Sequence, residues 1–245
     1  RAAIAAGLMT VLACGAPTAV AADPLVLDDV SWVAEPAAGK QGTPRLRITH
    51  AKSSSDQSFD GSRADFATVE AELRRDVAGP VSFGIVHQAG TLSCTGDRRR
   101  AFEGAGRCRF TSDAGFERRL AERGIAPRDR ASLLAMLLAD ATIELADGLI
   151  AAGVRPDDGD DLIAAAALKV TPAYVRDLKS EAILLTDVED AIACKALGVD
   201  GAYVRGLAAA GYRKLSADEV VGMKAMGVTG EYAQAMNRAA GGNSK

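Results

Sequence analysis

The spacing of apolar residues changes from a period of two to a period of about 3.6 near residue 110. In residues 45–50, Leu46 and Ile48 alternate with arginine and threonine, which is typical of a strand with one buried and one solvated face. Glycines, among them Gly96 and Gly106, separate several short runs of this kind. The expected strands are residues 25–33, 45–50, 81–87, 91–95 and 106–110. We therefore predict an antiparallel sheet of about five strands in a β-rich domain at residues 23–111.

Two segments between the expected strands have other patterns. Residues 53–56 are three serines and an aspartate, which is typical of a polar loop. Residues 66–77 show some alternation, but Glu70 and Arg74 also form a helical i,i+4 pair. We expect a short helix there.

Helical spacing replaces the alternation after residue 111. Ser112 or Asp113 can cap a first helix that carries Phe116. The apolar pattern then predicts one longer helix from Pro127 to Gly153. Residues 112–153 are thus expected to be connecting helices.

Residues 154–240 repeat with a period of 29 residues. The equivalent positions are Val170, Val199 and Val228, followed by Tyr174, Tyr203 and Tyr232. A residue that can cap a helix precedes each tyrosine by three positions, at Thr171, Asp200 and Thr229. Gly198 and Gly227 suit the left-handed turn that ends a helix, and Lys169 occupies this position in the first copy.

A further helix is expected before the second and third valine. Thr186 with Glu189, and Ser216 with Glu219, have the spacing of a capping box. Neither helix of such a hairpin can bury its apolar side alone, so the hairpins are expected to stack. The predicted fold class is α+β, with a small antiparallel β-rich domain followed by an α-helical repeat domain of helical hairpins. Residues 241–245 are a polar tail.

The N-terminal segment has the features of an export signal. Residues 2–13 are almost continuously apolar but shorter than the roughly 20 residues that cross a bilayer. Small residues precede Asp23, as at a signal peptidase site, so residues 1–22 are predicted to be a signal peptide. Cys14 lies in a segment similar to a lipoprotein box, and a lipid anchor there is the alternative. We expect a periplasmic or secreted protein without a membrane span in the mature chain.

Three cysteines follow the predicted signal peptide. Cys94 and Cys108 flank a glycine-rich connection between two expected strands, where a disulfide would close a short loop. The alternative is a pair of buried free thiols. Cys194 lies on the apolar side of a predicted helix and is expected to be an inert core residue.

Composition and motifs narrow the functional classes. The 245 residues carry 29 Lys and Arg against 32 Asp and Glu, a net charge of -3, so no basic excess points to nucleic acid. Nucleophile, phosphate-binding and zinc motifs do not occur, and we predict no catalytic residue, metal or cofactor. The aspartates of residues 157–161 fit a helix N-terminus better than a calcium loop. The arginines of residues 98–100 form either a solvated tip or a contact for an anionic partner.

The repeat resembles a known module. Residues 169–178, 210–212 and 215–218 are similar to helical repeats of bacterial exported proteins, which are also attached to some β-lactam-sensor-type membrane metallopeptidases. Residues 89–91 and 104–110 are similar to the β-rich segment that can precede those repeats. The resemblance implies the architecture and an envelope or signalling context. It transfers no catalytic residue, because neither histidine of this chain begins a His-Glu-x-x-His motif.

Two functions from different classes remain as hypotheses. The first is an exported, non-enzymatic protein-binding or scaffold module, possessing a recognition surface on the repeats and a protein partner. Its candidate binding residues are Arg176, Arg205, Tyr174, Tyr203 and Tyr232, although the tyrosines can instead pack between helices. The second is an envelope hydrolase with a site between the β domain and the first helices, near His87.

Overall fold

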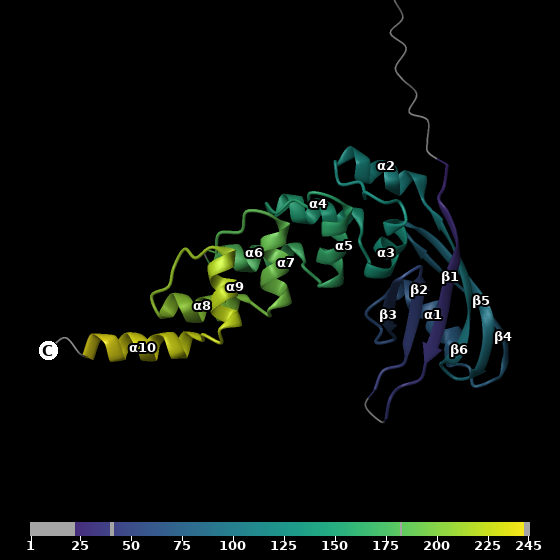
Figure 1. Cartoon of the computed structure of the whole chain (residues 1–245), viewed down its shortest axis with the longest axis horizontal. Helices are drawn as coiled ribbons and strands as arrows, with labels where there is room; N and C mark the ends of the chain where they lie inside the picture. The colour runs from purple at the N-terminus through teal and green to yellow at the C-terminus, as the bar shows by residue number, and fades with distance from the viewer. Residues whose placement is uncertain (1–22, 40–41, 182, 243–245) are drawn as a thin grey trace, which may run out of the picture.

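The structure, a computed structural model, describes residues 23–39, 42–181 and 183–242. The predicted signal peptide and Cys14 lie outside these residues. A sheet occupies one end of the molecule, and the helices extend away from it as an elongated array (Figure 1). This arrangement confirms the predicted α+β fold class.

The described residues form one antiparallel sheet of six strands in the order β3-β2-β1-β6-β5-β4. The strands are β1 (Val26–Glu35), β2 (Arg45–His50), β3 (Ser53–Ser58), β4 (Gly79–His87), β5 (Gly90–Arg100) and β6 (Glu103–Ser112). The loop predicted at residues 53–56 is wrong, because this segment is the edge strand β3. It pairs with β2 from Ser53 opposite His50 to Ser58 opposite Arg45. An edge strand needs no apolar alternation when its side chains border solvent. The polar sequence of β3 therefore gave no sign of a strand.

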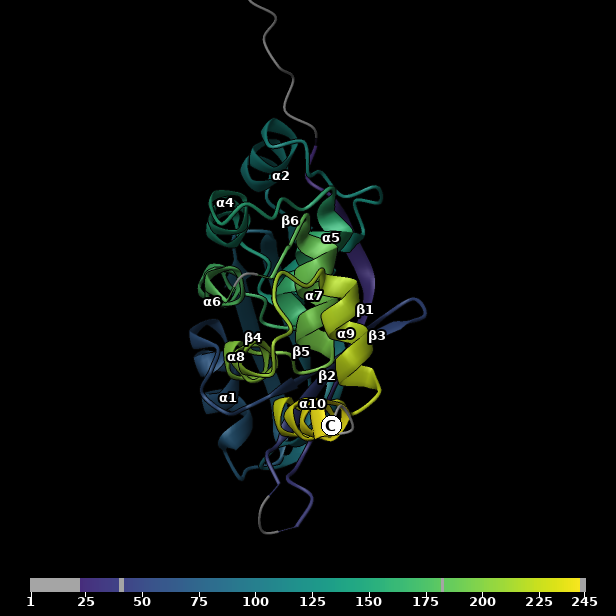
Figure 2. The same cartoon turned by 90° about the vertical axis from the view of Figure 1, so that its left-hand side faces the viewer.

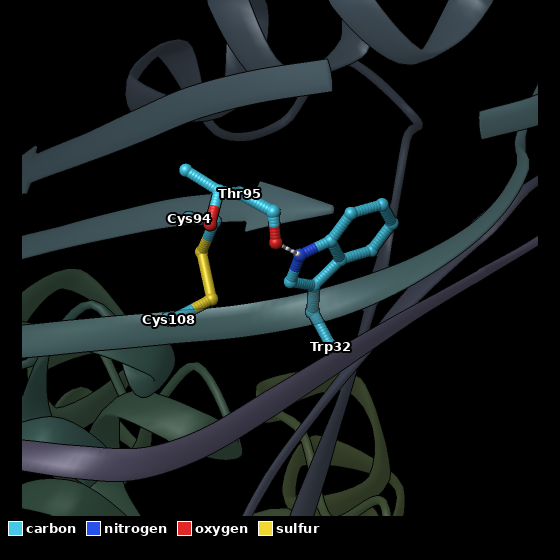
Figure 3. Close-up of a disulfide and its surroundings, with 4 residues drawn as sticks. All are labelled: Trp32, Cys94, Thr95 and Cys108. Atoms are coloured by element: carbon cyan, nitrogen blue, oxygen red, sulfur yellow. Dashed lines mark hydrogen bonds between the residues drawn. A yellow bond between two sulfur atoms is a disulfide. The ribbon is translucent and has the colours of Figure 1, made fainter. Parts of the chain in front are cut away.

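Glycines in β5 and β6 make room for Trp32. An added Cβ at Gly96 or Gly106 would come within 2.8 or 2.6 Å of an indole atom. The indole Nε1–H donates a hydrogen bond of 3.1 Å to the carbonyl of Thr95 (Figure 3). Both strands therefore run through these glycines, and both are longer than the predicted segments 91–95 and 106–110.

A short helix packs on β4. The 3-10 turn η1 (Ala64–Phe66) leads into α1 (Ala67–Arg74), which confirms the predicted helix and buries Val69 and Leu73. Arg98, from the three-arginine segment, is buried, and its Nε donates to the carbonyl of Val77 at 2.7 Å. Arg98 is therefore a structural residue and not part of an exposed basic tip.

The remaining chain is helical. Its helices are α2 (Ala114–Glu122), α3 (Ser132–Ala139), α4 (Ile143–Ala151), α5 (Gly159–Ala167), α6 (Pro172–Ser180), α7 (Val188–Ala196), α8 (Gly201–Ala209), α9 (Ala217–Ala225) and α10 (Gly230–Gly242). The single helix predicted from Pro127 to Gly153 is wrong, because α3 and α4 are separate. Asp140 ends α3 in the left-handed region (φ 65°), and the Thr142 hydroxyl caps α4. Because apolar residues lie on both sides of this break, the sequence pattern resembles that of one continuous helix.

The 29-residue period extends further toward the N-terminus than the sequence indicated. The helices α2, α4, α6, α8 and α10 begin at residues 114, 143, 172, 201 and 230. The residue before each helix accepts a hydrogen bond, through its side chain, from the backbone N–H three positions later. These residues are Asp113, Thr142, Thr171, Asp200 and Thr229. The helices α5, α7 and α9 begin at residues 159, 188 and 217, with the same interval. Residues 112–153 thus share the structural period of the repeat region.

The turns between helices follow the predicted chemistry with one exception. Gly198, Gly227 and Lys169 all have positive φ, between 57° and 73°. The capping box of Ser216 and Glu219 is confirmed. The box predicted at Thr186 is wrong, because Asp187 caps α7 one residue later.

Stacking places the helices in two layers. One layer is α2, α4, α6, α8 and α10, and the other is α3, α5, α7 and α9, with successive members in contact. Figure 2 shows α4, α6 and α8 on one side and α5, α7 and α9 on the other. Helix α3 also contacts β3, β5 and β6, and one cluster of buried residues continues from Val30 to Val220. The sheet therefore packs against α3, the first helix of the second layer.

Candidate functional site

Two of the three repeated tyrosines form hydrogen bonds between neighbouring hairpins. The Tyr174 hydroxyl donates to the carbonyl of Val199 at 2.8 Å, and the Tyr203 hydroxyl donates to the carbonyl of Val228 at 2.7 Å. Both rings are partly buried against the core, and this burial raises the pKa of each phenol above its ordinary value of 10. These two side chains hold successive hairpins in register, and their hydroxyls are already engaged.

A lysine from the following hairpin covers each of these rings. The Nζ of Lys195 lies 4.4 Å from the centre of the Tyr174 ring, and the Nζ of Lys224 lies 4.2 Å from that of Tyr203. Such cation–π contacts contribute about 0.5–1 kcal/mol at exposed sites. The same arrangement of a tyrosine, a lysine and a backbone carbonyl thus occurs at two equivalent interfaces.

Tyr232 has different surroundings. Its backbone N–H binds the Thr229 hydroxyl as in the other copies, but its side chain is 56% exposed. No later hairpin lies against it among the described residues. Tyr232 is the one candidate tyrosine that presents most of its ring to solvent.

The two candidate arginines also differ from each other. Arg205 pairs with Glu181 at 2.6 Å, which raises the pKa of the guanidinium above its ordinary value. Arg123 and Asp147 form an equivalent pair between α2 and α4, with the charges exchanged. Arg176 is exposed and has no ion-pair partner in the described part of the chain, because Ala152 occupies the position that would carry its acid.

Exposed apolar side chains recur at the same position in three hairpins. Leu168, Leu197 and Met226 directly follow α5, α7 and α9 as their C-cap residues, and they are 38, 41 and 75% exposed. Packed helices lie about 8–10 Å apart, so the three side chains form a row of roughly 20 Å, which we call the apolar row. Sequence reasoning missed it, although these residues have the same 29-residue spacing as the tyrosines.

A cleft lies beside the sheet. Its volume is about 1020 Å³, and residues of β3, α3 and α5 line it, among them Ser53, Ser55, Leu138 and Ile163. Lys169 lies at the same opening. The hydroxyl groups could bind a polar ligand, but the described lining residues include no hydrogen-bonded pair of a nucleophile and a base.

His87 and Asp140 lie near the wall of the cleft. The Nδ1 of His87 accepts a hydrogen bond from the N–H of Ala89, and its Nε2 lies 3.4 Å from a carboxylate oxygen of Asp140. Burial lowers the pKa of His87 below its ordinary value of 6.5. The negative charge of Asp140 favours the protonated imidazole and raises the pKa, but its effect is smaller than that of burial. Asp140 lines the cleft, whereas the imidazole is buried and does not. The pair joins β4 to the end of α3.

The cysteines have the expected arrangement. Cys94 and Cys108 lie opposite each other in β5 and β6 and form a disulfide, as Figure 3 shows. Cys194 is buried in α7, and burial raises the pKa of its thiol to about 11, so it is not a thiolate nucleophile at neutral pH.

The acidic segment at residues 157–161 caps a helix. Asp158 accepts hydrogen bonds from the N–H groups of Asp160 and Asp161 at the start of α5. In the part of the chain that the structure describes, no three His, Cys, Asp or Glu residues come together as a metal site. None of the helices in these residues combines the length and the apolar character that a membrane span requires.

No protein-family model matches the chain, and no curated protein or solved structure is significantly similar to it.

Proposed function

We propose that this chain is an exported, non-enzymatic protein-binding or scaffold module that acts in envelope sensing or regulation. The observation that carries the proposal is the apolar row of Leu168, Leu197 and Met226. Repeat proteins use side chains at one position of successive units as an extended contact surface, and exposed apolar patches favour protein contacts.

Two features support export. The disulfide between Cys94 and Cys108 is of a kind that persists in oxidising compartments. The sequence before Asp23 has the features of a signal peptide. The resemblance to repeats of exported bacterial proteins agrees with this context and stays a prediction.

The test is affinity capture from an envelope fraction with three forms of the chain. We expect the wild type to retain one or a few proteins that the triple variant Leu168→Ser, Leu197→Ser, Met226→Ser does not. The matched control replaces Val77 and Val86 by Ser, because both are exposed apolar residues outside the repeats. Equal capture by the triple variant and the wild type would exclude the apolar row as the interface.

The arginines provide a second comparison in the same assay. Arg176→Glu changes an unpaired charge on the repeats, whereas Arg205→Lys keeps the charge opposite Glu181. If the arginine side of the hairpins contributes to the interface, Arg176→Glu lowers capture and Arg205→Lys does not.

One observation favours the hydrolase alternative, namely that Asp140 lines the cleft beside His87. A general base must reach the proton that it abstracts. Because the His87 imidazole is buried outside the lining of the cleft, we favour the binding function.

A further inference from the structure

Helix α10 carries the face that other helices of its layer use to bind the next hairpin. Leu178 in α6 and Leu207 in α8 are completely buried, and the equivalent residue in α10 is Met236, which is 53% exposed. Tyr232 is 56% exposed, whereas Tyr203 is partly buried under the following hairpin. The exposed residues of α10 thus continue an interface that the chain has already formed between its own helices.

An exposed apolar face on a unit of stacked repeats favours association with another surface. In α10 the exposed positions include Tyr232, Ala235, Met236 and Ala239. Residues one turn apart on a helix share a side, so these four form a continuous apolar strip. At the other end of the described stack, α3 packs against β3, β5 and β6.

The strip is complementary to itself. When two copies of α10 lie antiparallel with their midpoint near residues 234–235, Tyr232 of each copy faces Met236 of the other. A thioether beside an aromatic ring is a favourable contact. The same pairing brings Glu231 of each copy beside Arg238 of the other, and both side chains are exposed. A surface with this symmetry produces a two-fold dimer.

We propose that α10 is an interface at which two copies of this chain associate end to end, with the two α10 helices antiparallel. The sheets then lie at the two far ends of the dimer, and the apolar row of each copy stays accessible. The inference is independent of the proposed function, because it concerns a different face of the repeats.

Sedimentation over a range of concentrations tests the association. We expect the wild type to change from monomer to dimer, and the double variant Tyr232→Lys, Met236→Lys to have a dimer dissociation constant at least about tenfold higher. The matched control, Val77→Lys with Val86→Lys, adds the same charges at exposed positions of the sheet domain and should associate like the wild type. A wild type that stays monomeric at every concentration, or a double variant that dimerises normally, would overturn the proposal.

Charge exchange tests the antiparallel arrangement. Glu231→Arg alone and Arg238→Glu alone should each weaken the dimer, since each places like charges together. The double exchange should restore it. A double exchange that associates no better than either single variant contradicts this pairing.

A single cysteine gives the geometry directly. Ala235→Cys lies close to the two-fold axis and should form a disulfide-linked dimer under mild oxidation. Ala239→Cys lies about 13 Å from its counterpart along the helix axis, from 1.5 Å per residue, and should not. Preferential cross-linking through Ala239→Cys would exclude the proposed pairing, as would binding of α10 to a different protein in place of a second copy. Helical circular dichroism of each variant confirms that it is folded.

Discussion

The repeated tyrosines Tyr174 and Tyr203 stabilise the packing between hairpins. Tyr174 and Tyr203 each donate to a carbonyl in the following hairpin and lie under a lysine. A phenol suits this position because its ring packs while its hydroxyl bonds a backbone group that would otherwise lack a partner. The two earlier copies have Phe116 and Leu145 instead, so this hydrogen bond belongs to the later interfaces only.

The tyrosines can be compared by removing only the hydroxyl. Tyr203→Phe should destabilise the chain by about 1 kcal/mol, because the carbonyl of Val228 loses its hydrogen bond. Tyr174→Phe should have a similar effect. Tyr232→Phe is the matched control and should leave stability unchanged, since its ring is mainly in solvent. Urea unfolding measures all three, and equal effects would contradict the structural difference between them.

At the scale of helices and strands, the sequence predicted the hairpins wherever side-chain identity was repeated. It missed the two earlier copies, because Phe116 and Leu145 replace tyrosine and Asp140 replaces glycine. The capping residues kept their spacing in all five copies, and that signal could have found them. The strand β3 was missed for another reason, since a polar edge strand is held by backbone pairing that leaves no apolar pattern.

The candidate site was less predictable than the fold. The cleft brings β3 together with α3 and α5, which are far apart in sequence. Neither residue spacing nor composition reports such a contact. The apolar row was in principle visible, but an exposed leucine and a buried one look alike in a sequence.

The turn after each first helix allows a test at this scale. Lys169 has a φ of 57°, a region that costs a residue with a Cβ roughly 1–2 kcal/mol, whereas Gly198 occupies the equivalent turn without that cost. Lys169→Gly should therefore stabilise the chain by up to about 1 kcal/mol. Gly198→Ala should destabilise it by a similar amount, since the added Cβ meets no neighbour and only the backbone is strained. Thermal or urea unfolding of both variants checks the opposite signs.

At the scale of the whole molecule, sheet and helices share one hydrophobic core. The cluster from Val30 to Val220 has no break where β6 ends and α2 begins. Each hairpin nevertheless contacts only its neighbours, and stability in such stacks is set locally. The first helices gain support from the sheet, while α9 and α10 have neighbours on one side only among the described residues.

Hydrogen exchange should follow this gradient. Amide protection is expected to be highest in β5, β6 and α3, and to fall through α7 to α10, because local opening is easiest at the end with the fewest packed neighbours. At concentrations that favour association, protection of α10 should rise selectively. Uniform protection from α3 to α10 would show that the stack opens as a single unit.

The sheet that covers the first helices fixes one end of the stack and leaves the number of hairpins free. The hairpins share one interval and one stacking arrangement, so one more or one fewer between α4 and α10 would change the reach of the molecule without altering the strands. Chains built on this plan can therefore differ in length by whole multiples of 29 residues. Duplication or loss of one short coding segment would therefore lengthen or shorten the molecule by one equal step.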